Sequence, residues 1–133
     1  MSIRYDVRAP VDDAALTALH GGAFSRPQDA VIPWSARLAT HSLTWVTARS
    51  GQHLVGFVNV IGDGGAHAVL LDTVVEPDQQ GRGIGRRLVS IAAAEARAAG
   101  CEWLHVDYEP TLAHFYEHGC GFRPTPAGLI PLT

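Results

Sequence analysis

The segment QQGRGIGRRL, residues 79–88, constrains what this chain can fold into more than any other stretch. Its glycines alternate with larger residues, as Gly81, Arg82, Gly83, Ile84 and Gly85. An apolar run, residues 66–75, comes shortly before the segment, and an alanine-rich run follows it as far as Gly100. This order predicts a loop between a strand and the longest helix. Because glycine is a poor helix former, three glycines at this point need an explanation.

The loop has the properties of an anion site. The first backbone N–H groups of a helix lack internal partners, and the helix dipole is positive there. Glycines let these groups approach a phosphate without a Cβ in the way. Arg82, Arg86 and Arg87 add positive charge that suits phosphate oxygens. A plain glycine turn before a solvated basic helix face would have the same composition, so the glycines alone do not establish a ligand.

Two familiar phosphate-binding patterns do not fit this loop. The Walker pattern needs Lys followed by Ser or Thr after the last glycine, and neither follows Gly85. The dinucleotide fingerprint needs a third glycine where this chain has Arg86. A phosphate-bearing ligand at this loop would therefore be of another class.

The whole chain, residues 1–133, is expected to form a single α/β domain. Strands are expected at residues 2–8, 43–49, 53–62, 66–75 and 102–108, with a terminal hairpin of residues 121–125 and 128–132. A first helix is expected to begin at a cap formed by Asp12 or Asp13 and to end at Gly21-Gly22. Three more helices are expected at residues 32–41, 84–99 and 110–118, and Gly119 is expected to end the last of them. A run of strands followed by strand–helix–strand predicts a mixed sheet with helices on its faces.

Composition excludes several classes of protein. The chain is 47% hydrophobic and 17% charged, which is ordinary for a globular domain. A net charge of −3 argues against a nucleic-acid partner. No apolar run is long enough to cross a bilayer, and no secretory signal is evident. Cys101 and Cys120 form no metal-type pair and are expected to be reduced thiols in the cytoplasm.

The loop QGRGIG, residues 80–85, resembles the Q/R-x-x-G-x-G/A signature of the GNAT N-acetyltransferase superfamily, which binds the pyrophosphate of acetyl-CoA. Residues 70–89 resemble that family's fourth strand, loop and third helix. The segment FYEHGCGF, residues 115–122, resembles its fourth helix and the following Gly-Phe. The resemblance implies a GNAT acyl-CoA N-acyltransferase fold: a mixed sheet splayed between its fourth and fifth strands, with about four helices on its faces.

The resemblance also implies where acetyl-CoA would bind as the acyl donor. The backbone at Thr73, Val74 and Val75 would contact the acetyl and pantetheine groups, which enter the splayed sheet almost as an extra strand. Val74 and Val75 can belong to the strand core as well, since only their backbone is used. The phosphate-binding positions would be Gln80, Gly81, Arg82, Gly83, Ile84, Gly85 and Arg86.

In this family a tyrosine of the fourth helix is the general acid that protonates the departing thiolate, and the resemblance assigns that role to Tyr116. Relatives usually place the tyrosine three residues before Gly-Phe, whereas here four residues intervene, so counting back from Gly121-Phe122 gives Glu117 instead. We prefer Tyr116 because Gly119 is a natural helix terminator, and the extra residue is expected in the turn after it. Tyr116 could alternatively be an amphipathic core residue.

Acetyl transfer to an amine also needs help in neutralising the amine, and three acids are candidates. Asp72 lies inside an apolar strand, where a bare carboxylate is unusual, and it is either the base or a structural hydrogen-bond acceptor. Glu109 stands where many relatives have a cofactor-contacting asparagine, so it either faces the acceptor or caps the helix near Pro110. Asp107 either lines the site or is solvated. Backbone N–H near Val75 would stabilise the oxyanion.

Other reactive side chains have less specific signals. His114 and His118 match an H-x-x-E-H pattern, but the short helix and short remaining chain argue against zinc, so no metal is expected. His67 and His105 are expected to be satisfied polar groups beside the cleft. Cys120 lacks an adjacent base at a recognisable spacing. Phe24 and Trp34 are expected to pack in the core, although their loop borders the acceptor pocket in the family.

Together these observations predict transfer of an acetyl group from acetyl-CoA to a primary amine, and the acids near the cleft favour a small cationic one. A non-catalytic acyl-CoA sensor and a protein N-terminal acetyltransferase are the alternatives. The sequence leaves open the identity of the acceptor, the acyl-chain length, and whether the chain acts as a monomer or a homodimer.

Overall fold

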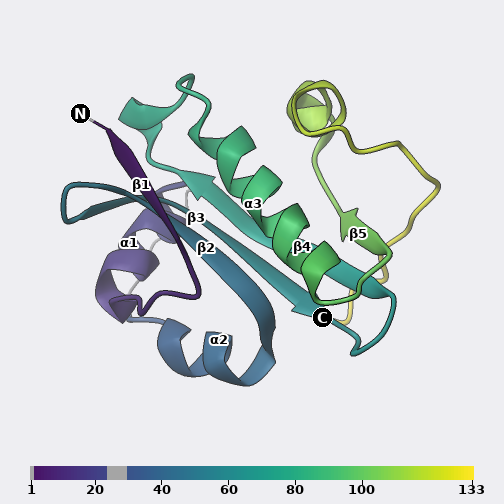
Figure 1. The fold of residues 1–133 in the computed structure, drawn as a ribbon, viewed down its shortest axis with the longest axis horizontal. Coiled ribbons are helices and arrows are strands. Elements are labelled where there is room, and N and C mark those ends of the chain that lie inside the picture. The colour runs from purple at the N-terminus through teal and green to yellow at the C-terminus, as the bar shows by residue number, and fades with distance from the viewer. Residues whose placement is uncertain (1, 24–29) are drawn as a thin grey trace.

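The computed structural model describes residues 2–23 and 30–133 and places five strands in one mixed sheet of order β1-β2-β3-β4-β5 (Figure 1). The strands are β1 (Ile3–Val7), β2 (Ser42–Ser50), β3 (His53–Gly62), β4 (His67–Val75) and β5 (Trp103–Val106). Neighbours from β1 to β4 pair antiparallel, and β4 pairs with β5 in parallel. The expected mixed sheet is confirmed, although β5 is shorter than the predicted strand 102–108.

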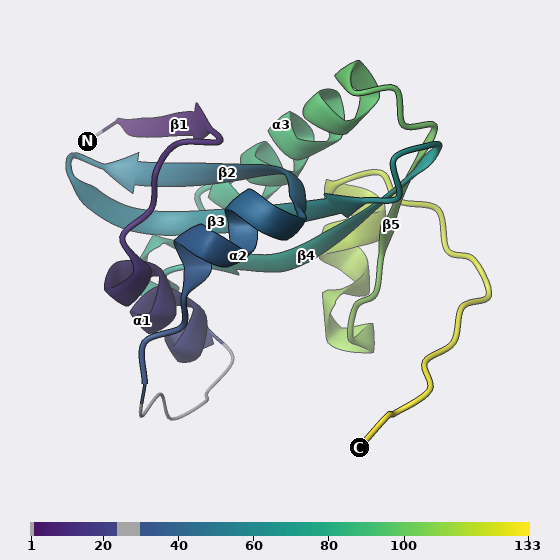
Figure 2. The ribbon, with the colours of Figure 1, turned by 90° about the horizontal axis from the view of Figure 1, so that it is seen from below.

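Helices cover both faces of this sheet (Figure 2). The α-helices are α1 (Asp13–Ala23), α2 (Trp34–His41) and α3 (Ile84–Ala98), and a π-helix, η3 (His114–Gly119), follows β5. Short 3-10 turns, η1 (Pro77–Gln79) and η2 (Pro110–Leu112), precede α3 and η3. The α3 helix lies on one face, and α1 and α2 lie on the other. Among the described residues, no helix has both the length and the apolar character that crossing a membrane requires.

Each face of the sheet has its own apolar core. The α3 side buries Val58, Leu70 and Leu88, and the α1/α2 side buries Leu16, Phe57, and Trp34 with its neighbours. Trp34 is therefore a core residue, as predicted. Phe24 lies outside the described residues. The division into two cores follows from the alternation of side chains along β3, since Phe57 and Val58 point to opposite faces.

Two sequence-based predictions of secondary structure are wrong. Gly21 and Gly22 lie within α1 and do not end it. The helix is stabilised by the fully buried Leu16 and by the Asp12 cap, whose carboxylate accepts from Ala15 N–H at 2.8 Å. The terminal hairpin does not form: residues 120–133 contain no strand. Three prolines in that segment, Pro124, Pro126 and Pro131, lack the N–H that a ladder needs.

The α3 helix approaches the sheet most closely at Gly56 of β3. A Cβ at this glycine would lie 3.0 Å from Leu88 Cδ1 and 3.2 Å from both Ala48 Cβ and Ile84 Cγ2. These atoms belong to fully or nearly fully buried side chains, so none can move aside without disturbing the core. Gly56 therefore sets the spacing between the sheet and the helix that begins at the glycine loop.

Replacing Gly56 by alanine tests this close approach. We expect Gly56→Ala to lower the free energy of unfolding by about 1–3 kcal/mol, because an extra methyl overpacks the interface. Gly22→Ala is the matched control, since Gly22 is an exposed helical glycine with nothing within 4 Å of an added Cβ; it should raise stability by about 0.5–1 kcal/mol. Urea unfolding measures both, and equal effects in the two variants would contradict the close packing.

Candidate active site

The sheet opens between β4 and β5. The two strands pair only over His67–Leu70 of β4 and Trp103–Val106 of β5, whereas β4 continues to Val75. Residues 71–75 therefore have no strand beside them on the β5 side. Backbone groups at such an edge can pair with an extended ligand, as an added strand would. The expected splay is thus present at Thr73, Val74 and Val75.

A β-bulge lies at the start of this opening. Asn59 of β3 faces Leu71 and Phe57 faces Val74, so Asp72 and Thr73 together oppose the single residue Val58. Asp72 has a φ of +59°, a conformation that non-glycine residues rarely adopt. Asp72 contacts α1 on one face of the sheet, and Thr73 lies beside η3 on the other, as neighbouring residues of a strand do.

The Asp72 carboxylate lies in a network of hydrogen bonds. His20 Nε2 of α1 donates to Oδ1 at 3.0 Å, and Asn59 Nδ2 donates to Oδ2 at 3.3 Å. Ser42 Oγ in turn donates to Asn59 Oδ1 at 2.6 Å. Burial alone would raise the pKa of Asp72, but these bonds and the positive charge of Arg37 outweigh it and leave the pKa below its usual value. Asp72 is therefore a stable anion that can hold a cation but is a weak base.

His20 is a site residue that sequence analysis missed. It lies 52 residues from Asp72, and its ring packs against Trp34 with centroids 5.1 Å apart. The only signal in the sequence was a polar residue on the face of α1 that also carries Leu16. Both readings of Asp72, structural acceptor and site acid, are compatible with this network.

The glycine loop has the geometry of an anion site. Gly81 and Gly83 have φ values of +79° and +81°, and a Cβ at either would meet no atom within 4 Å, so the backbone is open to solvent. Among the described residues, no backbone hydrogen bond uses the N–H groups from Gly81 to Arg86; Arg87 is the first, donating to the Gly83 carbonyl at 3.1 Å. These free donors are the groups that could hold a phosphate.

The residues next to these glycines make contacts within the protein. Gln80 Nε2 donates to the Val75 carbonyl at 3.1 Å and so joins the loop to the end of β4. Arg82 donates to the Gln79 side chain at 2.7 Å. Ile84 is buried in the α3 core. Arg87, which the sequence grouped with the phosphate-facing arginines, lies over the Tyr5 ring at 5.9 Å and so points toward β1.

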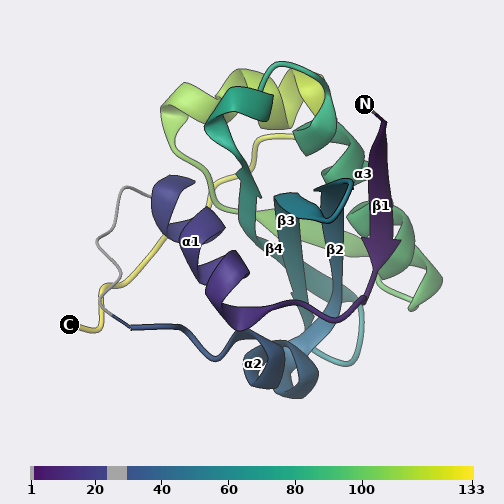
Figure 3. The same ribbon diagram turned by 90° about the vertical axis from the view of Figure 1, so that its left-hand side faces the viewer.

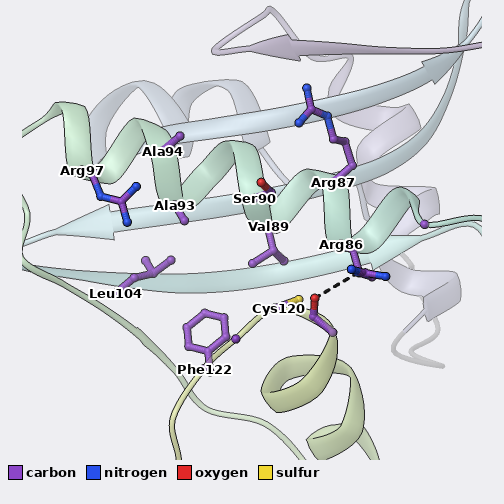
Figure 4. A pocket seen from close by; sticks show the side chains of 13 residues that line it. Arg86, Arg87, Val89, Ser90, Ala93, Ala94, Arg97, Leu104, Cys120 and Phe122 are labelled. Atoms are coloured by element: carbon purple, nitrogen blue, oxygen red, sulfur yellow. Dashed lines mark hydrogen bonds between the residues drawn. The ribbon is translucent and has the colours of Figure 1, made fainter.

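Two contacts join the start of α3 to η3. A Cβ at Gly85 would lie 3.1 Å from two ring carbons of Phe115, so only glycine allows this aromatic ring to pack here. Arg86 Nε donates to the Gly119 carbonyl at 3.1 Å (Figure 4). Between α3 and the segment after η3 lies a groove of about 700 Å³, bordered by Arg86, Arg97 and Phe122. The glycine loop therefore opens onto a groove with a basic rim.

Tyr116, which the sequence predicts as the general acid, lies on η3. Its side chain is 7% exposed, its ring stacks on Tyr108 with centroids 5.1 Å apart, and its hydroxyl lies beside the Thr73 side chain. Burial raises the pKa of Tyr116, although Thr73 opposes this. The phenol is therefore protonated at neutral pH and able to donate. Glu117 is engaged elsewhere, accepting from the Tyr108 hydroxyl at 2.6 Å.

The extra residue before Gly121-Phe122 falls where a helix passes into a turn. Cys120 is in a turn after Gly119, as expected, and His114–Gly119 form a π-helix that was not predicted, whose i→i+5 bonding takes in an additional residue. Phe122 N–H then closes the end by donating to the Tyr116 carbonyl at 3.0 Å. The π-helix keeps Tyr116 beside Thr73 despite the altered spacing.

The remaining candidates are not brought into the opening by any contact. Glu109 is exposed and does not cap η2 with its side chain, so the capping alternative is wrong. Burial raises the pKa of the Cys120 thiol, although Arg86 opposes this, which makes Cys120 a poor nucleophile. His67 and His105 share a hydrogen bond at 2.7 Å. In residues 2–23 and 30–133, no three His, Cys, Asp or Glu side chains come together as a metal site would require.

Comparisons with known proteins agree on one family. The model of the acetyltransferase (GNAT) family matches residues 12–122. Serotonin N-acetyltransferase 2, chloroplastic, of Oryza sativa subsp. japonica is 39% identical over 84 residues, which cover 60% of this chain and 42% of that protein. The chain thus matches less than half the length of this relative.

Solved structures share the fold over nearly the whole chain. A GNAT family protein from Streptococcus pneumoniae TIGR4 is 22% identical with a TM-score of 0.80, covering 99% of this chain and 98% of that one. Glucosamine-6-phosphate N-acetyltransferase from Arabidopsis thaliana is 14% identical with a TM-score of 0.80, covering 98% of each chain. At these identities the structures establish the fold and not the substrate.

The state of Asp72 can be tested through the pH dependence of stability. Because the folded-state pKa of Asp72 is lowered from about 3.8, its ionised form stabilises the fold above that pH, and this contribution is lost as the pH falls through the folded-state pKa. We expect wild type to exceed Asp72→Asn in unfolding free energy near neutral pH, with a difference that shrinks below about pH 4. Urea unfolding at a series of pH values measures this, with Asp107→Asn as the exposed control. A difference that stays constant into the acid range would show that the fold does not favour the ionised carboxylate.

Proposed function

Since this chain belongs to the GNAT family of acetyltransferases, we propose that it moves an acetyl group from acetyl-CoA to a primary amine by direct attack. One observation carries the proposal: the unpaired edge of β4, the open glycine loop and the protonated phenol of Tyr116 meet at one end of the sheet. These three features supply the groups that bind an acyl thioester, hold its phosphates and protonate its leaving group.

The donor side of this site fits acetyl-CoA. The pantetheine arm would pair with the backbone of Thr73, Val74 and Val75, since that edge has no strand partner. The pyrophosphate would accept from the N–H groups between Gly81 and Arg86, which have no backbone acceptor among the described residues. The Arg86 guanidinium, tied to Gly119 through Nε, would keep a positive charge at this point.

Chemistry at the acetyl group needs no covalent enzyme intermediate, because the thioester is already activated. The amine nitrogen attacks the carbonyl carbon, the C–S bond breaks, and the thiolate takes the Tyr116 hydroxyl proton. A protonated amine loses two protons in all: one replaces the Tyr116 proton and one goes to solvent. Neutralising an alkyl ammonium at pH 7 costs about 4.6 kcal/mol, so holding the amine beside the thioester matters.

Asp72 would hold the ammonium form of the acceptor rather than deprotonate it. Both of its oxygens accept hydrogen bonds, and its lowered pKa makes it a poor base. Its charge lies at the start of the opening, next to Thr73. The name of the Oryza sativa relative, a serotonin N-acetyltransferase, also supports an amine acceptor. Glu109 is exposed after β5, so a further role on the acceptor side is open to it.

Release of free CoA thiol from acetyl-CoA, measured with a panel of amines and peptides, tests the function directly. Thiol release that depends on an amine would support an enzyme. Acetyl-CoA binding without release by any acceptor would favour the acyl-CoA sensor, and release with peptides alone would favour a protein N-terminal acetyltransferase.

Substitution of Gly83 tests the phosphate site. We expect Gly83→Val to weaken acetyl-CoA binding about tenfold or more, because a β-branched side chain would occupy the space before the N–H groups. Gly64→Val is the matched control: Gly64 has a φ of +79°, close to the +81° of Gly83, and open space around it, so the strain of the two changes should be similar. Calorimetry measures affinity, and wild-type affinity in a folded Gly83→Val protein would exclude this site.

Tyr116→Phe tests the general acid. The change keeps the buried ring and removes only the hydroxyl, so we expect turnover to fall about 10²-fold with little change in acetyl-CoA affinity. Tyr108→Phe, which alters the stacked neighbour, should retain most of the activity. Pre-steady-state kinetics would establish that chemistry limits the rate. A Tyr116→Phe enzyme that then turns over at the wild-type rate would remove Tyr116 from the mechanism.

A further inference from the structure

Arg86 connects the two helices that carry the proposed phosphate site and the proposed general acid. Figure 3 shows η3, in yellow-green, at the same end of the molecule as the loop that leads into α3. Arg86 belongs to the first turn of α3, and its backbone N–H is one of the donors that no described backbone carbonyl accepts. Its guanidinium reaches η3, where Nε donates to the Gly119 carbonyl at 3.1 Å (Figure 4).

The contact between Arg86 and Gly119 involves most of the arginine side chain. A Cβ built on Gly119 would lie 3.7 Å from both Cγ and Cδ of Arg86, so the aliphatic part of the arginine packs along the end of η3. The Gly119 carbonyl is at a helix end, where carbonyls lack partners within the helix. Because Nε is the donor, the two terminal nitrogens of the guanidinium can still bind phosphate oxygens.

Few contacts fix the position of η3. This π-helix has six residues, and Tyr116 is the one that is buried. The Tyr116 ring meets the Phe115 ring edge-on, with centroids 4.8 Å apart, and Phe115 in turn packs against Gly85 of α3. The orientation of Tyr116 therefore depends on how η3 is held against the start of α3.

Two side chains from other elements donate hydrogen bonds to η3. The Tyr108 hydroxyl donates to Glu117 at 2.6 Å, and Tyr108 belongs to the segment that leads from β5 into η2 and η3. Arg86 lies 33 residues before Gly119 and belongs to α3. Of these two contacts, the arginine contact is the one that joins η3 to the glycine loop.

A phosphate group on Arg86 would restrain the end of η3. Arg86 is exposed, and among the described residues its guanidinium forms a hydrogen bond through Nε alone. Phosphate oxygens bound to the terminal nitrogens would fix the plane of the guanidinium, since charge-assisted bonds to arginine are strong and directional. Through Nε, the Gly119 carbonyl would be fixed as well. Proton transfer from Tyr116 needs its hydroxyl within hydrogen-bond reach of the sulfur, so a restrained helix end favours the reactive geometry.

We propose that Arg86 is a positioning residue, which uses the phosphates of the acyl donor to place the Tyr116 hydroxyl for protonation of the thiolate. This inference rests on the proposed acetyl transfer and goes beyond it, because a group remote from the thioester then contributes to the chemical step. Binding energy from the phosphates is used in the transition state and not only in donor affinity.

Comparison of acetyl-CoA with S-acetyl-pantetheine, which has the same thioester but no phosphates, tests this dependence. In wild type we expect the maximal single-turnover rate with acetyl-CoA to exceed that with S-acetyl-pantetheine about tenfold. In Arg86→Gln this ratio should fall to about one. Glutamine keeps an N–H at the position of Nε, where it can donate to Gly119, and lacks the charge and the terminal nitrogens.

The ratio of rates distinguishes three roles of Arg86. If Arg86 only binds phosphate, Arg86→Gln weakens acetyl-CoA binding but keeps the wild-type ratio of maximal rates. If Arg86 only stabilises the fold, the rates with both donors fall equally, and the ratio again stays at its wild-type value. Either result, or a wild-type ratio near one, would overturn the inference. A partly unfolded variant loses rate with both donors alike, so the ratio does not depend on the folded fraction.

Arg97→Gln is the matched control, since Arg97 borders the same groove but lies about three turns further along α3. It should keep the wild-type ratio.

A double-mutant cycle tests whether Arg86 acts through Tyr116. In a Tyr116→Phe background, Arg86→Gln should cause no further loss of rate with acetyl-CoA, because the hydroxyl that Arg86 positions is absent. Full additivity of the two changes would overturn this inference while acetyl transfer itself stands. Failure of every amine and peptide to release thiol would instead overturn the proposed function.

Discussion

The register shift between β3 and β4 is the constraint on which the rest of the site depends. Two residues of β4, Asp72 and Thr73, oppose one residue of β3, and Asp72 adopts a positive φ to achieve this. The pairing of β4 with β5 ends at Leu70, just before this bulge. The acid on the α1 side and the hydroxyl beside Tyr116 belong to consecutive residues immediately beyond that point, on opposite faces as neighbouring strand residues are.

Other parts of the fold hold this arrangement in place. His20 and Asn59 bind the carboxylate from a helix and from the neighbouring strand, which offsets the cost of the unusual backbone conformation. On the opposite face, Gly85 allows Phe115 to pack at contact distance, and Arg86 binds the end of η3. The loop that could hold phosphate and the helix that carries Tyr116 are thus joined to each other as well as to the sheet.

Much of this organisation could be predicted from the sequence because it depends on local patterns. Alternation, capping residues and the glycine loop gave the order of strands and helices, and the motif placed Tyr116 near β4. The His20–Asp72 bond could not be predicted, since it joins residues brought together only by tertiary packing. The π-helix and the bulge could not be predicted from the sequence either, because each inserts one residue and neither has a distinctive composition. The prediction of a terminal hairpin was wrong because three prolines, which cannot donate to a strand ladder, interrupt the apolar pattern.

The sheet also acts as a partition between two independent surfaces. Groups proposed to bind the acyl donor, from Thr73 to Arg86, lie along one edge and toward α3, whereas Asp72, Leu71 and Trp103 face the α1 side. Substitutions on the second surface touch none of the groups on the first. A side chain on the α1 side of β4 can therefore be replaced without altering the backbone edge of residues 73–75 or the glycine loop, and the bulge marks the boundary between these two surfaces.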